Sequence, residues 1–294
     1  MRRPANSNRR AAWLLLPFFA AFVIFWVVPL LGGLRMAVYS DGVFGDTKFV
    51  GLDHFQKLGT DESYFKAVRN TFVFAACSIV VIIPLALVLA QLLRVANTRA
   101  RPGLTFLLLL PGLTPPAVLA LLFLLVFHGR EGVLNQLFVI PLGFAPINWL
   151  KDPAWIMPAL VLQSVWRWTG MIAFFVLAGM EAIPRPLYEA AHLETRSRAR
   201  VFWSVTVPLL RPVLLFSAVY LAVDAFSMFS GAYVLLGASG GTADAGLLLV
   251  SYVYQQAFTF GNFGTAAAIS VSVAPVLLVL LWMCFALPRR FERA

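Results

Sequence analysis

IPRPLYEAAHLETRSRARVFWSVTVPLLRP, residues Ile183–Pro212, is a polar and arginine-rich segment between two long apolar runs of this 294-residue chain. In an otherwise apolar protein, such a connection is expected at the surface, where it can contact a partner. Pro186 suits the first turn of a helix, because the N–H that proline lacks is not needed there. We therefore expect one short helix from Leu187 to about Leu193 and a second from about Ser197 to Ser204, ended by Pro208.

The composition of the whole chain is that of an integral membrane protein. Hydrophobic residues make up 61% of it and charged residues 12%, and the mean hydropathy is +0.84. Soluble domains carry about 45–50% apolar and about 25% charged residues. The formal net charge is +10, but the basic residues are spread between apolar runs rather than gathered in one patch, which argues against nucleic-acid binding.

Six segments are apolar and long enough to cross a bilayer, which takes about 20 helical residues. The first segment follows basic residues, as in a signal peptide, but its apolar run exceeds the roughly 7–15 residues of a signal core, so we expect it to be retained. The chain is thus predicted to be an all-α transmembrane protein, with an N-terminal segment (residues 1–12) and one membrane domain (residues 13–294). The expected spans are Trp13–Leu34, Thr71–Leu93, Leu104–Phe127, Trp155–Met180, Leu209–Leu236 and Ala266–Leu287.

The distribution of basic residues predicts the orientation of these spans. With the N-terminus inside, fifteen of the 23 lysines and arginines fall in cytoplasmic segments, seven in external segments and one, Arg167, within the fourth span. Cytoplasmic loops of membrane proteins are enriched in lysine and arginine. We therefore expect both termini and the loop 183–208 in the cytoplasm. The first external loop, about Arg35–Asn70, is expected to form a small ordered cap or a short amphipathic helix.

The loop 183–208 carries a recognisable order of residues: Glu-Ala-Ala, then Glu-Thr, a phenylalanine and Val-Pro. This order resembles the EAA loop of the inner-membrane permeases of binding-protein-dependent ABC importers, particularly the maltose and glycerol-phosphate type that moves sugars. The family has Asp-Gly where this chain has Glu194-Thr195. Glycine suits left-handed turns that threonine disfavours, so the turn is expected to have a different shape here. The resemblance assigns contact with a separate ATPase to Glu189, Ala190, Ala191, Glu194, Thr195, Phe202 and Pro208.

Two other stretches carry the same resemblance. Phe49–Phe55 (FVGLDHF) is similar to the family's GLDNF element, and Gly240-Gly241-Thr242 is similar to its Gly-Gly-Pro element. Both favour the first permease of the maltose type, and with the loop they imply a six-helix ABC importer permease domain with cytoplasmic coupling helices. The implied partners are a second homologous permease subunit, two copies of a P-loop ATPase and an extracytoplasmic solute-binding protein that delivers a sugar. The implied location is a bacterial cytoplasmic (inner) membrane.

Two charged residues, Arg167 and Asp224, fall deep within apolar spans. A charge at the bilayer centre costs about 2.5–3.5 kcal/mol on insertion scales and therefore usually faces a cavity or a partner. Gln163, Trp166 and Gly170 are expected to share a helix face with Arg167. Sugars need polar partners for their hydroxyls and aromatic faces for their C–H surfaces. We therefore predict a substrate path lined by Gln163, Trp166, Arg167, Asp224, Phe226, Ser227 and Tyr233. The alternative is a buried Arg167–Asp224 ion pair that fastens two helices.

Motifs for nucleotide hydrolysis and metal binding are absent from the sequence. None of the four lysines follows a glycine, so there is no G-x-x-x-x-G-K-[ST] phosphate loop. No H-E-x-x-H motif occurs, and His192 has no cluster of metal ligands around it. We therefore expect no enzyme activity, metal or cofactor in this chain, and ATP with Mg²⁺ would bind the partner ATPase.

Other functions are open at this point. An ABC permease for glycerol-phosphate or another small polar solute would use Arg167 to bind the anion. A secondary transporter driven by an ion gradient would use Arg167 and Asp224 as a relay, although the internal repeats common in such carriers are not visible. A membrane enzyme would need a catalytic cluster that the sequence lacks.

Overall fold

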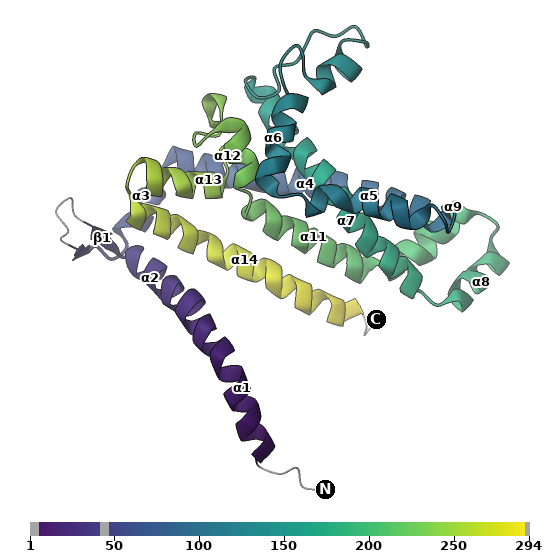
Figure 1. The fold of residues 1–294 in the computed structure, drawn as a ribbon, viewed down its shortest axis with the longest axis horizontal. Helices are drawn as coiled ribbons and strands as arrows, with labels where there is room; N and C mark the ends of the chain where they lie inside the picture. Colours follow the sequence, from purple (N-terminus) through teal and green to yellow (C-terminus); the bar gives the residue numbers. More distant parts are fainter. Residues whose placement is uncertain (1–5, 42–46, 292–294) are drawn as a thin grey trace. The chain divides into compact units, whose positions relative to one another are not determined.

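The computed structural model describes residues 6–41 and 47–291, and side chains within 14–40 and 47–283 (Figure 1). The predicted N-terminal segment 1–12 therefore lies partly outside the described residues. The chain forms two compact units. One comprises residues 1–61 with 253–274, and the other comprises residues 62–252 with 275–294.

The first unit begins with a long apolar helix. It consists of α1 (Asn6–Phe22), the π-helical turn η1 (Val23–Val27) and α2 (Val28–Met36). From Leu14 to Met36 it forms a 23-residue candidate membrane span, and none of its most apolar stretch is buried within the chain. Such a surface needs lipid or another subunit to cover it.

In the predicted external loop after this helix, the described residues form a short pair of strands and a helix, as predicted. Strands β1 (Tyr39–Asp41) and β2 (Thr47–Phe49) pair antiparallel, and the short helix α3 (Asp53–Leu58) follows. His54 of α3 is buried, and its ring nitrogens lie 3.2 Å from the Tyr39 carbonyl oxygen and 3.4 Å from Thr265 Oγ1. Gly264 packs against this ring so closely that a Cβ there would overlap it. The FVGLDHF stretch therefore places α3 against the start of α14.

The second unit is built around two long helices, α4 and α7. α4 packs along α7 and α11, and α5 packs on α7 (Figure 1). Gly170 of α7 lies so close to the Leu108 carbonyl of α5 that there is no room for a Cβ, and small residues are typical where membrane helices approach closely. The elements of this unit are α4 (Glu62–Val95), α5 (Arg101–Leu113), α6 (Pro116–Val126), η2 (Asn135–Val139), α7 (Pro153–Ala182), α8 (Arg185–Glu194), α9 (Arg198–Val201), η3 (Phe202–Thr206), α10 (Val207–Leu209), α11 (Arg211–Phe226), α12 (Ser230–Leu236) and η4 (Thr242–Asp244). α13 (Leu249–Tyr254) and α14 (Phe263–Phe291) each extend from one unit into the other, and η5 (Gln255–Thr259) belongs to the first unit.

Four spans are single helices among the described residues: Leu14–Met36, Glu62–Val95, Pro153–Ala182 and Phe263–Met283. Two bent pairs of helices also pass the test for a span, Arg101–Leu113 with Pro116–Val126 and Arg198–Leu209 with Arg211–Phe226. The count among the described residues reaches six only if each bent pair is one span. The all-helical transmembrane class is confirmed, with the small β1–β2 ribbon as an addition. The third and fifth predicted spans are both interrupted.

The third predicted span, Leu104–Phe127, is bent by 97° between α5 and α6. Thr114 and Pro115 both leave the helical region, with ψ values of 135° and 134°. Each of these residues precedes a proline, and the proline ring disfavours helical geometry in the residue before it. The two consecutive prolines 115 and 116 therefore break the span.

The fifth predicted span, Leu209–Leu236, is also discontinuous. A bend of 66° separates the helix ending at Leu209 from α11. α11 ends at Phe226, and Phe229, with φ −127° and ψ −64°, separates it from α12. Asp224 therefore lies near the end of a helix and beside a stretch of non-helical backbone, rather than in the middle of a span.

Candidate functional site

The polar loop folds into two short helices. α8 runs over Arg185–Glu194 with Pro186 in its first turn, as predicted. Thr195 then takes the extended conformation, with φ −150° and ψ 138°, which suits a β-branched residue. Its Oγ1 accepts a hydrogen bond from the Ser197 N–H (3.2 Å), and Ser197 Oγ accepts one from the Arg200 N–H (3.3 Å). These two hydroxyls fix the turn and cap the second helix.

The second helix is longer than predicted. It passes from α9 through η3 and α10, and it ends at Leu209 rather than at Pro208. The π-helical turn Phe202–Thr206 ends two residues before Pro208. This wider turn reduces the clash between a proline ring and the carbonyl four residues earlier, so the helix continues.

The residues that the resemblance assigns to ATPase contact lie along this pair of helices. Glu189, Ala190 and Glu194 are exposed, whereas Ala191, Thr195, Phe202 and Pro208 are half-buried. Leu193, which sequence reasoning missed, is 91% exposed at the end of α8. An exposed leucine beside two small alanines and two carboxylates gives α8 a face that is open for docking.

Tyr188, also missed, joins α8 to the membrane helices. Its hydroxyl accepts a hydrogen bond from Arg94 Nη1 of α4 (3.1 Å) and lies 3.3 Å from Thr206 Oγ1 of η3. The Arg94 guanidinium also lies 4.5 Å from the centre of the Tyr188 ring. Thr206 is almost fully buried, at 2% exposure. Tyr188 therefore connects α8 with both α4 and η3 through one side chain.

A cavity of about 160 Å³ lies within the second unit, between α6, α7 and the end of α11. Its charged residues are Arg167 and Asp224. Trp168 Nε1 donates a hydrogen bond to Asp224 Oδ2 (2.7 Å), and the Arg167 guanidinium lies 4.5 Å from the centre of the Trp168 ring. The lining residues are Pro116, Leu119, Gln163, Ser164, Arg167, Trp168, Asp224, Ser227, Met228, Phe229, Ser230 and Gly231.

Two buried polar atoms of this cavity have no hydrogen-bond partner in the described part of the chain. They are Gln163 Oε1, an acceptor, and Arg167 Nε, a donor. An unsatisfied buried polar group costs about 1–3 kcal/mol, so both atoms favour occupation of the cavity by a polar solute or by water.

The structure brings together four of the seven residues predicted for the substrate path: Gln163, Arg167, Asp224 and Ser227. The expectation that Trp166 shares their face is wrong. Its side chain is 62% exposed, because the cavity-facing residues Ser164 and Trp168 lie on the other side of Gln163 and Arg167 around the helix.

Two other predicted residues, Phe226 and Tyr233, do not line the cavity. Phe226 is buried edge-on against Phe72, with 5.1 Å between ring centres. Tyr233 packs on Phe229 at the same centre-to-centre distance of 5.1 Å.

The alternative of an Arg167–Asp224 ion pair is also wrong for the described chain, where the ion pairs are Lys66–Asp244 and Arg101–Glu181. Asp224 is held by Trp168 instead. The sequence offers one signal for Trp168 as a cavity residue. It lies four residues after Ser164, and the two share a helix face next to that of Gln163 and Arg167.

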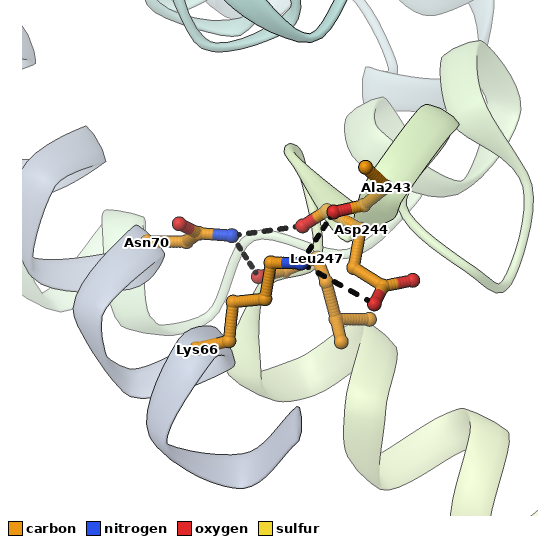
Figure 2. Close-up of polar contacts among 5 residues, drawn as sticks. All are labelled: Lys66, Asn70, Ala243, Asp244 and Leu247. Carbon is orange, nitrogen blue, oxygen red and sulfur yellow. Dashed lines mark hydrogen bonds and ion pairs between the residues drawn. The ribbon is translucent and has the colours of Figure 1, made fainter. Parts of the chain in front are cut away.

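At the start of α4 in the second unit, a strained loop is fixed to this helix (Figure 2). Ala243 and Asp244 both have φ +52°, which is costly for residues with a Cβ. Asn70 Nδ2 donates to the carbonyls of Asp244 (3.0 Å) and Leu247 (3.2 Å). Lys66 donates to the Ala243 carbonyl and lies 3.5 Å from the Asp244 carboxylate. The Gly240-Gly241-Thr242 element leads into this loop, and α4 holds its shape.

Comparison with known proteins agrees with this arrangement. The model of the family described as "Binding-protein-dependent transport system inner membrane component" matches residues 82–293. The arabinooligosaccharides transport system permease protein AraP of Bacillus subtilis is 30% identical over 97% of this chain and 91% of its own length. The lactose transport system permease protein LacF of Rhizobium radiobacter is 30% identical over 93% and 92%. The trehalose/maltose transport system permease protein MalF of Thermococcus litoralis is 30% identical over 95% and 93%.

The fold also has a solved counterpart. A chain of a bacterial alginate ABC transporter, in complex with an alginate pentasaccharide-bound periplasmic protein, superposes with a TM-score of 0.82. The superposition covers 97% of this chain and 96% of the other, at 21% sequence identity.

Proposed function

Because this chain belongs to the family of binding-protein-dependent transport system inner membrane components, we propose that it is the permease subunit through which an ATP-driven importer moves a sugar or oligosaccharide. Members of this family are transport components rather than enzymes. The relatives named above are permeases for arabinooligosaccharides, for lactose and for trehalose/maltose, which supports a sugar cargo.

The observation that carries the cargo proposal is the polar cavity between α6, α7 and the end of α11. Gln163, Ser164 and Ser227 offer polar partners for hydroxyl groups, and Trp168 supplies an aromatic ring. Trp168 is oriented by its bond to Asp224, so part of the site is organised before cargo arrives. The volume of about 160 Å³ is below the roughly 300 Å³ of small ligand pockets, which fits a path that a second permease subunit completes.

The energy for transport would come from partners of this chain. In this proposal two P-loop ATPases hold ATP and Mg²⁺, and α8 with Glu189 and Leu193 docks onto one of them from the cytoplasm. Closure of the ATPases displaces α8, and the contacts of Tyr188 with Arg94 and Thr206 transmit that displacement to the membrane helices. An external binding protein delivers the cargo, and both termini of this chain lie in the cytoplasm of a bacterium.

A second candidate cargo is a solute with an anionic group, as in the glycerol-phosphate class. Arg167 Nε is buried and lacks a partner among the described residues, and Arg167 forms no ion pair with Asp224. A free guanidinium donor in a buried cavity suits a carboxylate or phosphate. The variant Arg167→Gln should separate the two classes, since it would abolish uptake of an anionic solute but reduce uptake of a neutral sugar only in part.

The test of the proposed function is purification of the tagged chain from its host in a mild detergent, with identification of co-purifying proteins by mass spectrometry. We expect a P-loop ATPase and a second permease to be recovered with it. Recovery of the chain alone, still active in transport without ATP, would instead establish a carrier driven by an ion gradient.

A further inference from the structure

Another cavity, of about 500 Å³, lies where the end of α4 meets α8 and the helix α9–η3. Three arginines line it, namely Arg94, Arg185 and Arg198, together with His192, and Glu189 is its one lining carboxylate. None of these arginines forms an ion pair in the described part of the chain. The cavity is therefore basic, and its arginine charges are not neutralised by the protein.

The three arginines differ in how they are held. Arg94 is engaged by the hydroxyl and ring of Tyr188. Arg185 and Arg198 are exposed, and no carboxylate of the described residues pairs with either guanidinium. Two guanidinium groups that converge on one cavity suit a phosphate, because each can donate two parallel hydrogen bonds to its oxygens.

An apolar groove of about 320 Å³ adjoins this cavity. The two share Gln91, Arg198 and Phe202 as lining residues. The remaining walls of the groove are Leu87, Val88 and Leu92 from α4, and Ala199 and Trp203 from the helix α9–η3.

Exposure and spacing show that the groove opens to the surroundings of the subunit. Val88, Leu92 and Trp203 are 56%, 58% and 65% exposed. Val88 and Leu92 lie one turn apart on α4, and Arg94 lies in the last turn of the same helix, so the α4 surface changes from apolar to basic near its end. Tryptophan is enriched where such a boundary coincides with a membrane surface.

From this juxtaposition we propose that the basic cavity and the apolar groove together bind an acidic phospholipid. Its phosphate lies between Arg185 and Arg198, and one acyl chain lies along Val88, Leu92 and Trp203. Gln91 lines both the cavity and the groove, and its Oε1 is buried without a hydrogen-bond partner among the described residues. This oxygen accepts a hydrogen bond from a head-group hydroxyl. Basic pockets between helices on the cytoplasmic side of a membrane are known binding sites for anionic head groups.

The site would join two parts of the transport machinery. Its walls come from α4, which crosses the membrane, and from α8 and α9, which form the coupling loop. A lipid held there would stabilise the position of the loop relative to α4. This inference rests on the cytoplasmic orientation of the loop proposed above, but it does not depend on the cargo.

The experiment measures lipid binding rather than transport. The complex of the tagged chain with its partner subunits is purified in mild detergent and washed free of lipid. It is then incubated with equal amounts of dioleoylphosphatidylglycerol and dioleoylphosphatidylcholine, and the retained lipid is quantified by mass spectrometry. We expect retention of phosphatidylglycerol in excess. Arg185→Gln and Arg198→Gln should each lower its affinity about fivefold, as expected for the loss of one basic residue near a phosphate.

Matched controls separate this site from general charge and surface effects. Arg196→Gln removes an equal charge from the same loop but from a residue outside both cavities, so retention should be unchanged. Val88→Trp should fill the groove and lower retention without altering charge. Val80→Trp, two helical turns earlier and 69% exposed, should have no effect.

Several outcomes would overturn the proposal. Equal retention of the two lipids, or an equal loss in Arg196→Gln, would leave no specific site. Displacement of the lipid by inorganic phosphate, with Val88→Trp unchanged, would make the cavity a site for free phosphate. Loss of the ATPase or of the second permease from the Arg198→Gln complex, with lipid retained, would assign the arginine to a protein interface.

Discussion

Trp168 shows how much of the membrane cavity depends on one side chain. It holds Asp224 through a 2.7 Å hydrogen bond and stacks under Arg167, so both charged groups of the cavity are positioned by the same indole. Its neighbour Trp166 is 62% exposed and makes no such contact with the cavity. The pair of tryptophans therefore provides an internal control for the cavity.

Trp168→Phe should destabilise the purified complex and reduce uptake, because the Asp224 carboxylate loses its donor inside the protein. The expected cost is about 1–3 kcal/mol, the usual penalty for a buried polar group left without its partner. Thermal unfolding monitored by size-exclusion chromatography, combined with uptake assays, measures both effects. Trp166→Phe should match the wild type, and equal losses in the two variants would contradict the role given to Trp168.

Glu189→Lys tests the docking face of α8. Glu189 is exposed, and reversal of its charge should weaken the ATPase contact while the chain still inserts into the membrane. Co-purification of the ATPase, scored against Glu131→Lys on an external segment, gives the readout. Normal recovery of the ATPase and normal uptake with Glu189→Lys would count strongly against docking at this residue.

At the scale of elements, the coupling loop is fastened to α4 and η3 by a short chain of contacts through Tyr188. The variant Tyr188→Phe keeps the ring beneath Arg94 but removes the hydroxyl that contacts both Arg94 and Thr206. We expect the ATPase to co-purify normally and its stimulation by cargo to fall several-fold. Thr206→Val should cause part of the same loss. Full stimulation in both variants would show that the hydroxyl network does not transmit the motion.

Two variants of α4 are expected to loosen the loop at residues 240–247 to different degrees. Asn70 is half-buried and bonds two carbonyls, whereas the Lys66–Asp244 ion pair is 42% exposed at each end and is worth only about 0–1 kcal/mol. Asn70→Leu should therefore loosen the loop more than Lys66→Met, as measured by the rate of proteolysis at residues 240–247. Ala243→Gly should slow proteolysis, since glycine adopts φ +52° without strain. The opposite order of the first two variants would show that the contacts of Lys66 with Asp244 and with the Ala243 carbonyl dominate.

At the scale of the whole molecule, the sequence predicts what depends on local composition. Apolar runs locate the spans, and the ordered external loop and the start of α8 at a proline also follow from local chemistry. Breaks in spans are harder to predict, since isolated prolines are tolerated in membrane helices. Pro84 lies inside the continuous helix α4, whereas Pro115 and Pro116 produce a bend of 97°. The consecutive prolines take two successive residues, Thr114 and Pro115, out of the helical region, which the single Pro84 does not do.

The residues of the cavity were likewise predictable within one helix but not between two helices. Gln163 and Arg167 follow from helical spacing, but the bond between Trp168 and Asp224 joins residues 56 positions apart on two helices. Helix spacing gives no information on which residue of α11 faces α7. Instead of the alternative ion pair with Arg167, Asp224 accepts a hydrogen bond from Trp168, and no local pattern in the sequence indicates this contact.

The central claim is that cargo crosses the membrane through this chain at the expense of ATP. Its most direct test is uptake of labelled sugar by proteoliposomes that contain the purified complex, with the binding protein outside and ATP inside. We predict uptake that requires both ATP and the binding protein, and that is lost with Glu189→Lys. Uptake that proceeds without ATP and follows an imposed ion gradient would contradict this account.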